Sequence, residues 1–456
     1  MVDFNEYYSP ENYDPYSISS IFDYAKDLKG HTLADKCHSD ILEKNYAGKG
    51  NFGHYLEKFY FGYNPNNNPG PDFNYVDIEL KSGAIVKTTK GFRAKERLAI
   101  GQINYFNIVD ETFETSHVWE KLKKPLLVFH IYKKDEDPRN YNITNVNIIR
   151  YSESEIAQIK EDWNLIKYKV LKGNAHQISG GDTLYLEAAT TGVKNQKYVE
   201  QPFSKELAHP RRFALKPAFV TTLLKKEQIS NLESEPKPQV IKDKPVVLPQ
   251  DALTNKIDEF RNISLEETLK ILNIKKSNQK NFHSRVSKSL IEYLKSELKE
   301  KNGINLFDTK EQLILRTCRV IDGKIKEHIS FPYIRYDEVV NQNWEESHFS
   351  EIMESKFLFV FWEKINEEWF LKKIKLWNAP PKEIIEAKRI WEKTKRLILD
   401  KQADNLPKTT ESYFTHVRPH GRDSNDKYPT HYGVDVKKQS FWIHKNYIEE
   451  NILNNG

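Results

Sequence analysis

The chain has 456 residues, with a formal net charge of +5. Its 24 Tyr, 24 Phe and 8 Trp are ample for packed cores, and at about 100–200 residues per domain the length predicts two or three domains. The small positive charge favours an anionic partner only weakly. The 2 cysteines, Cys37 and Cys318, lie far apart, which excludes a disulfide framework and a CxxC zinc site and indicates a reducing compartment.

No segment has the pattern of a targeting or membrane-spanning sequence. The opening residues, MVDFNEYYSPENYDPY, lack the basic start and apolar core of a signal peptide. No run approaches the ~18 apolar residues of a spanning helix. We therefore expect a cytoplasmic protein without a membrane partner.

The first half predicts alternating helices and strands. NFGHYLEKFYFGY at 51–63 has one apolar helical face, VDIELKS at 76–82 reads as a strand, and PLLVFHIY at 125–132 as a buried central strand. Ser152 begins a capped helix that continues through Val170. The second half repeats the plan, with KFLFVFWE at 356–363 and a helix over 381–399. This order is typical of an α/β or α+β fold with a mixed central sheet.

The two halves are copies of one fold joined by a linker. Residues 231–251 contain four prolines and many charges without a helical or strand period, which predicts a linker. When 98–133 is aligned with 329–364 without a gap, nine of the 36 positions are identical, among them Leu127 with Leu358. A later pairing sets YLEAATTG (185–192) opposite FTHVRPHG (414–421). The repeat predicts two globular domains.

One strand of the first half carries charges on one face. In PDFNYVDIELKSG (71–83), alternation places Asp77, Glu79 and Lys81 opposite the apolar residues. The pattern fits a solvated strand face, and it also fits a catalytic strand. Asp72, in the preceding turn, completes D-x6-E-x-K, a set suited to phosphodiester hydrolysis. Two carboxylates suffice for Mg²⁺, and a nearby ammonium can orient water and stabilise charge on phosphorus.

Three segments give this weak pattern a more specific meaning. The order and spacing of these segments resemble those of the MutH family: first KGNFGHYLE, then PDFNYVDIELKS, then FETSHVWEKLKKPLLVF. This family comprises a mismatch-repair nicking endonuclease and two-domain restriction enzymes that cut at GATC. The resemblance implies a restriction-endonuclease-like fold, present here as two tandem copies. It also implies a Mg²⁺-dependent enzyme whose partner is double-stranded DNA containing GATC.

The resemblance implies roles for individual residues. Asp72 and Glu79 would hold the metal, and Glu57 would be an outer or second-metal ligand. Lys81 would orient the nucleophilic water, and Lys49 would contribute near the phosphate. Lys121 would contact DNA phosphate beside the scissile bond. In the base-reading loop Glu187 stands where the repair enzyme has an arginine, and Ala214 in RRFALK replaces a tyrosine. The first half's DNA-binding candidates are Thr190, Thr191, Lys194 and Lys216.

The second half lacks the acidic residues of this set. Aligning NFGHYLE with NFHSRVS and DIELKS with QLILRT places Ser287 at Glu57, Ile314 at Glu79 and Arg316 at Lys81. A metal needs its acidic ligands, so this half should not cleave. It does contain HVRPHGRD (416–423), whose Arg418, His420 and Arg422 are candidates for reading DNA, because arginine is the commonest reader of guanine.

Three functions remain open. The first is a type II restriction endonuclease with a catalytic domain at 1–230, a linker at 231–251 and an inactive DNA-binding domain at 252–456. We expect this enzyme to be a monomer that pairs on DNA, because a palindrome presents two equivalent strands. The second is a strand-nicking repair enzyme, and the third is a non-enzymatic GATC-binding regulator. The intact E-x-K in one half favours an enzyme.

Overall fold

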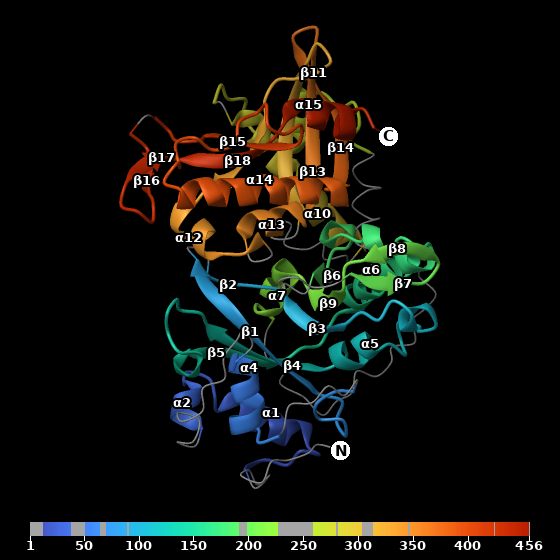
Figure 1. Ribbon diagram of the computed structural model, residues 1–456. Helices are drawn as coiled ribbons and strands as arrows, with labels where there is room; N and C mark the ends of the chain where they lie inside the picture. The colour runs from blue at the N-terminus through green and yellow to red at the C-terminus, as the bar shows by residue number, and fades with distance from the viewer. Residues whose placement is uncertain are drawn as a thin grey trace. The chain divides into compact units, whose positions relative to one another are not determined.

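The computed structural model describes residues 12–37, 51–63, 70–88, 91–190, 198–226, 259–279, 281–302, 313–344, 347–423 and 425–455. The helices and strands form two compact units, the first ending with α7 and the second beginning with α9, except that residues 177–183 belong with the second unit (Figure 1). The predicted linker at 231–251 lies outside the described residues. Among the described residues no helix is long and apolar enough to cross a membrane.

The first unit contains a four-stranded mixed sheet in the order β2-β1-β4-β5. Strand β1 pairs with β4 in parallel and with β2 antiparallel, and a second sheet has the order β3-β9-β6. The strands are β1 (Glu79–Thr88), β2 (Gly91–Ala94), β3 (Leu98–Gln102), β4 (Pro125–Ile131), β5 (Ile143–Ile148), β6 (Leu186–Thr190), β7 (Val199–Gln201), β8 (Ser204–Ala208) and β9 (Arg211–Leu215). The helices are α1 (Ile18–Lys26), α2 (Leu33–Lys36), α4 (Asn51–Tyr55), the π-helix η2 (Leu56–Tyr60), α5 (His117–Leu122), α6 (Glu153–Leu171) and α7 (Pro217–Leu223).

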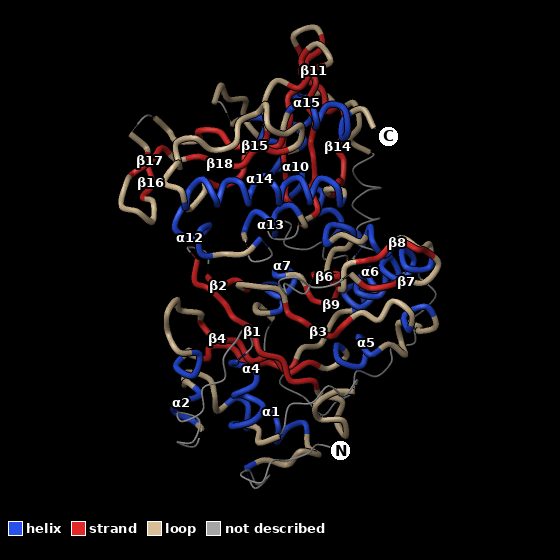
Figure 2. Tube along the Cα trace, viewed as in Figure 1, coloured by secondary structure: helices blue, strands red, loops and turns tan. Residues whose placement is uncertain are grey.

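The second unit repeats this strand plan. Its sheets have the orders β11-β10-β13-β14 and β12-β18-β15, and each unit also has a separate hairpin (Figure 2). The strands are β10 (Leu313–Ile321), β11 (Lys324–Ile325), β12 (Ile329–Tyr333), β13 (Lys356–Ile365), β14 (Glu368–Asn378), β15 (Thr415–Pro419), β16 (Lys427–Pro429), β17 (Asp435–Lys437) and β18 (Gln439–Ile443). The helices are α9 (Leu265–Ile271), α10 (Phe282–Asn302), α12 (Tyr336–Asn341), α13 (His348–Met353), α14 (Pro381–Leu399), α15 (Lys445–Ile448) and the π-helix η8 (Glu449–Leu453).

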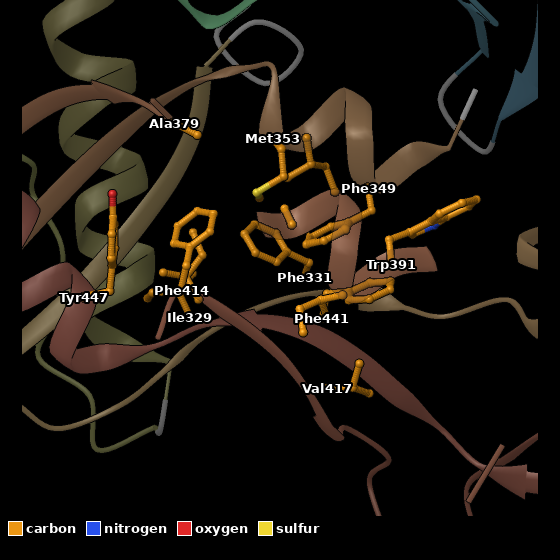
Figure 3. Packing of buried hydrophobic residues seen from close by; sticks show 14 of the residues in the cluster. Ile329, Phe331, Phe349, Met353, Ala379, Trp391, Phe414, Val417, Phe441 and Tyr447 are labelled. Atoms are coloured by element: carbon orange, nitrogen blue, oxygen red, sulfur yellow. The ribbon is translucent and has the colours of Figure 1, made fainter. Parts of the chain in front are cut away.

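Aromatic side chains fill both cores. In the second unit the rings of Phe349 and Phe441 stack with their centroids 4.0 Å apart, close to Phe331 and Trp391 (Figure 3). In the first unit the core between β1, β4 and the N-terminal helices includes Leu56, Tyr60, Leu80, Leu126 and Val128. Burying such side chains gains about 1.5–3 kcal/mol each, so these cores hold the central strands in a fixed register.

The predicted elements are mostly confirmed. Strand β4 is buried along almost its whole length, α6 begins with a capping box at Ser152, and α14 occupies 381–399. The predicted strand at 76–82 is wrong at its start, because β1 begins only at Glu79. Asp77 adopts a left-handed conformation with φ 56° in the turn before the strand, and its carboxylate lies 3.2 Å from Lys123 Nζ. Asp77 therefore does not share the strand face of Glu79.

Candidate active site

The first strand residue of β1 lies at the centre of the candidate site. Glu79 is 1% exposed, and its Oε1 accepts hydrogen bonds from the ammonium groups of Lys81 and Lys121, the latter at 3.0 Å. Lys81 is two residues along the same strand, and Lys121 comes from α5. A buried carboxylate is stable only when it is paired, and here two cations supply the pairing.

Asp72 is held beside Glu79 by the turn that precedes β1. Its Oδ2 accepts the backbone N–H of Leu80 at 2.9 Å, and its own N–H donates to Glu79 Oε2 at 3.2 Å. The antiparallel bridge between Phe73 and Ile78 closes this turn. Two carboxyl groups seven positions apart in sequence are thus brought together.

Glu57 and Tyr63 add to the negative and polar character of this site. Burial, followed by the charges of Asp72 and Glu79, raises the pKa of Glu57 to about 7. Tyr63 is almost fully buried, and its hydroxyl has no hydrogen-bond partner among the described residues. Burial and then the charges of Asp72, Glu57 and Glu79 raise the pKa of that hydroxyl, so it stays protonated.

The same charges determine the protonation of Asp72 and Lys81. Burial, then repulsion from Glu79, raises the pKa of Asp72 to about 6. Burial opposes the charged form of Lys81, but Glu79 and Asp72 outweigh it and raise the pKa of the ammonium. Lys81 is therefore protonated at neutral pH and can donate hydrogen bonds, but it cannot accept a proton. Perturbed titrating groups of this kind often mark functional sites.

The donor set suits a hard divalent cation that keeps its own water. Mg²⁺ is often bound through one or two carboxylates with several waters retained, and Asp72 with Glu79 supplies two. Asp72 Oδ1 accepts no hydrogen bond from the described residues, so one oxygen is available. In the described ranges no group of three His, Cys, Asp or Glu side chains is arranged to hold a metal, and the role of Glu57 as an outer or second-metal ligand stays a prediction.

The remaining predicted residues are placed as follows. Thr190 ends β6 as the partner of Arg211, and Lys216 caps α7, its N–H donating to Tyr185 O at 2.9 Å. Lys121 lies inside the candidate site, where its Nζ is 3.0 Å from Glu79 Oε1. Lys49, Thr191 and Lys194 lie outside the described residues.

Comparisons with known proteins agree with this geometry. Residues 61–162, which contain Asp72, Glu79, Lys81 and Lys121, match the family model of the DNA mismatch repair enzyme MutH. The chain is therefore similar to endonucleases of the MutH type. It is 26% identical to the type II restriction enzyme Sau3AI of Staphylococcus aureus, over 95% of this chain and 98% of that protein. The MutH proteins of Shewanella woodyi and Vibrio campbellii are 27% and 28% identical over 46% and 49% of this chain, and over 93% and 99% of their own lengths.

The second copy of the strand plan can be aligned with the first by its strand register. In the first unit the β4–β5 ladder shifts between Phe129 and His130, and in the second the β13–β14 ladder shifts between Phe361 and Trp362. Matching these two bulges pairs LLVF (126–129) with LFVF (358–361). The ungapped pairing of Leu127 with Leu358 is therefore wrong by one residue, because alternation places those two side chains on opposite faces of their sheets.

The corrected register supports the predicted loss of acidic residues. In the first unit Lys81 on β1 pairs with Leu127 on β4. In the second unit Phe359 is the counterpart of Leu127 and pairs with Arg316, so Arg316 is the counterpart of Lys81. The same comparison of strand partners makes Ile314 the counterpart of Glu79, and the Ile314 side chain packs against the aromatic core of the second unit. The Arg316 guanidinium lies over the Phe331 ring at 5.1 Å, and burial lowers its pKa to about 10. The central carboxylate of the cluster is therefore replaced by an apolar side chain in the second unit.

The position predicted for Glu57 also has a structural role in the second unit. Ser287 is fully buried on α10, and its Oγ accepts a hydrogen bond from Trp362 Nε1 at 3.0 Å. A neutral hydroxyl paired with an indole N–H cannot serve as an anionic ligand. The second copy therefore has no carboxylate at the position that corresponds to Glu57.

The Arg-Pro loop of the second unit projects from β15. Arg418, His420 and Arg422 are exposed, and the Arg418 guanidinium lies 5.6 Å from the centre of the Trp442 ring. His420 is oriented by a 2.8 Å contact between its Nδ1 and Ser440 Oγ. Among the described residues Arg418 makes no side-chain hydrogen bond, so its donors are available to a ligand.

One sequence correspondence in this region needs correction. The β6–β9 and β15–β18 ladders run in the same register, so Ala189 is the counterpart of Arg418 and Glu187 that of His416. Glu187 is buried, and its Oε1 lies 3.1 Å from Arg97 Nε. Glu187 therefore does not occupy the arginine position.

Sequence reasoning missed two features of the site. Tyr63 was overlooked because a lone tyrosine in an aromatic segment is more often a core residue, and only its unpartnered hydroxyl distinguishes it. The contact of Lys121 with Glu79 joins residues 42 positions apart in sequence, and no local spacing predicts it.

Proposed function

We propose that this chain is a type II restriction endonuclease that hydrolyses both strands of double-stranded DNA at GATC with Mg²⁺. The first unit would cut, and the second would bind DNA without cutting. The observation that carries the proposal is the cluster of Asp72, Glu79 and Lys81, which occurs in one copy of a duplicated fold, whereas the other copy has the apolar Ile314 at the position of Glu79. The fold itself does not require these charges.

The residues of the first unit can be assigned roles in hydrolysis. Bound Mg²⁺ would polarise the phosphate and acidify a coordinated water. Asp72 and Glu79 would hold the cation, while the Lys81 ammonium orients the water and stabilises the charge that develops on the phosphate oxygens. Because Lys81 is protonated, the proton must go elsewhere, and Glu57 has a pKa near 7 that suits an acceptor. The water oxygen then bonds to phosphorus as the bond to the leaving oxygen breaks.

The proposed specificity rests on the exposed loop of the second unit. Arg418 presents several donors from a rigid sheet edge, and arginine binds O6 and N7 of guanine in the major groove. The restriction enzyme Sau3AI, similar to this chain along nearly its whole length, supports a restriction role over a repair role. The GATC sequence itself comes from the family resemblance.

A strand-nicking repair function is the second candidate. The MutH relatives match a little under half of this chain, and the matched family model lies in the first half, which holds the complete cluster. A single active site cuts one strand at a time, so nicking is the simplest outcome for an isolated monomer. The extra unit has no counterpart in those relatives and favours restriction.

The proposal is tested on supercoiled plasmid DNA carrying one GATC site, with Mg²⁺. Linear product supports a restriction enzyme, an accumulating nicked circle supports the repair candidate, and no cleavage with Mg²⁺, Mn²⁺ or Co²⁺ supports a binding protein. Sedimentation of the free protein and of its complex with a GATC duplex tests the proposed pairing on DNA. A stable dimer without DNA would refute that part.

A further inference from the structure

The first unit has no arginine at the position of Arg418. The matching ladders place Ala189 there, and the Trp442 position is taken by Ala214. In the second unit this sheet face carries Arg418 over Trp442. The same face of the first unit carries Ala189 and Ala214 at those two positions. If the first unit reads bases, another side chain must supply the hydrogen-bond donors.

An arginine occupies the neighbouring strand of that same face. Arg212 on β9 is the direct cross-strand partner of Ala189, whereas the equivalent pair in the second unit is Arg418 with Ser440. The arginine of this face therefore lies on β9 in the first unit, whereas in the second unit it lies on β15, the counterpart of β6. Side chains at directly opposed positions lie about 4.5–5.5 Å apart at Cβ, so a flexible arginine reaches the same area from either strand.

The surroundings of Arg212 leave its Nε without an acceptor among the described residues. Its Nε is buried without a hydrogen-bond partner in the part of the chain that the structure describes. The Glu187 carboxylate on this face is already engaged by Arg97 Nε at 3.1 Å. Burial, then the positive charge of Arg97, lowers the pKa of Arg212, and Glu96 and Glu187 only partly compensate. A buried donor without an acceptor is costly, and a ligand that offers acceptors removes that cost.

We propose that Arg212 is the base-reading arginine of the first unit and binds O6 and N7 of a guanine in the recognition sequence. The proposal rests on the proposed function, since it requires that the chain recognises GATC. Ala189 and Ala214 are themselves buried, whereas Arg212 is partly exposed, so a base edge would reach its guanidinium from the solvent side. Each copy would then read DNA from the same sheet face with an arginine from a different strand.

The test uses the full chain and two duplexes, one with GATC and one in which 7-deazaguanine removes the N7 acceptor. Cleavage rates at subsaturating protein are measured for the wild type, Arg212→Ala and Arg212→Lys. A lost bidentate contact corresponds to about 5- to 150-fold, so Arg212→Ala should cut GATC more slowly by a factor in that range. It should also lose most of the wild type's discrimination against 7-deazaguanine. Arg212→Lys, with a single donor group, should be intermediate.

The controls separate the alternatives. Arg319→Ala removes a surface arginine paired with Glu327 and should change neither rate. Repeating the series in the Arg418→Ala background removes the second unit's contribution to discrimination. If Arg212→Ala slows both duplexes equally, the residue contacts phosphate and the proposal is wrong. If its unfolding midpoint falls while discrimination is retained, the role is structural and the proposal is again wrong. If the wild type does not cut at GATC, the proposed function fails as well.

Discussion

Replacing Glu57 by glutamine should stabilise the metal-free protein. Raising the pKa of Glu57 from 4.5 to about 7 corresponds to about 3 kcal/mol for ionising this side chain in the folded state, at about 1.4 kcal/mol per tenfold change. Glu57 is partly exposed, so solvent reduces this figure, and we expect Glu57→Gln to raise the free energy of unfolding by about 2 kcal/mol at pH 8. In a domain of this size that is roughly a 4–8 °C rise in Tm.

The sign of the effect follows from the direction of the pKa shift. A carboxyl group whose pKa is raised on folding favours the folded state below its unfolded pKa, and it loses that contribution as pH rises through the folded value. For Glu57 this window runs from 4.5 to about 7. The stabilisation by Glu57→Gln should therefore fall below about 1 kcal/mol at pH 5 and reach its full size near pH 8.

The assay is urea unfolding at pH 5 and pH 8 in the presence of a chelator, followed by tryptophan fluorescence. Glu200→Gln is the matched control, because Glu200 is exposed on β7, and its unfolding curves should coincide with those of the wild type at both pH values. The reasoning is refuted if Glu57→Gln is equally or less stable than the wild type at pH 8. It is also refuted if the gain is the same at pH 5 and pH 8.

Three further outcomes follow from the same site. Lys81→Ala should reduce the cleavage rate roughly 100- to 1,000-fold and spare DNA binding, whereas Lys205→Ala on the exposed surface of β8 should cut normally. The apparent affinity for Mg²⁺, measured by titrating cleavage, should weaken as pH falls below 7, because Glu57 and Asp72 then hold protons that compete with the cation. A pH-independent Mg²⁺ midpoint would contradict this assignment. Arg418→Ala should weaken binding to a GATC duplex by about 1–3 kcal/mol while changing binding to unrelated DNA much less, as gel-shift titrations would detect.

The sequence predicted those helices and strands that depend on the pattern of neighbouring residues along the chain. The apolar run of β4, the capping box at Ser152 and the helix of 381–399 each follow from short-range patterns, and each is present. Asp72 could be chosen over Asp77 only with the help of the resemblance. Its role as the neighbour of Glu79 depends on a turn that alternation does not describe, since Asp77 leaves the strand geometry.

Other properties of the site depend on contacts between distant residues. Lys121 reaches Glu79 because α5 ends just before β4, which pairs with β1, and the raised pKa of Glu57 requires that the charges of Asp72 and Glu79 act on it. The one-residue shift between the two copies of the central strand became visible through the paired bulges. The correspondence of Arg212 with Arg418 likewise needs the cross-strand register.

The central claim is that the cluster of Asp72, Glu79 and Lys81 cuts DNA at GATC. It is tested most directly by incubating wild-type protein and Lys81→Ala with plasmid DNA and Mg²⁺ and sequencing the ends of the products. We expect wild-type ends at GATC in both strands, and DNA that Lys81→Ala leaves almost uncut over the time in which the wild type cuts it completely. Ends at unrelated sequences, or equal cleavage by Lys81→Ala, would contradict the account.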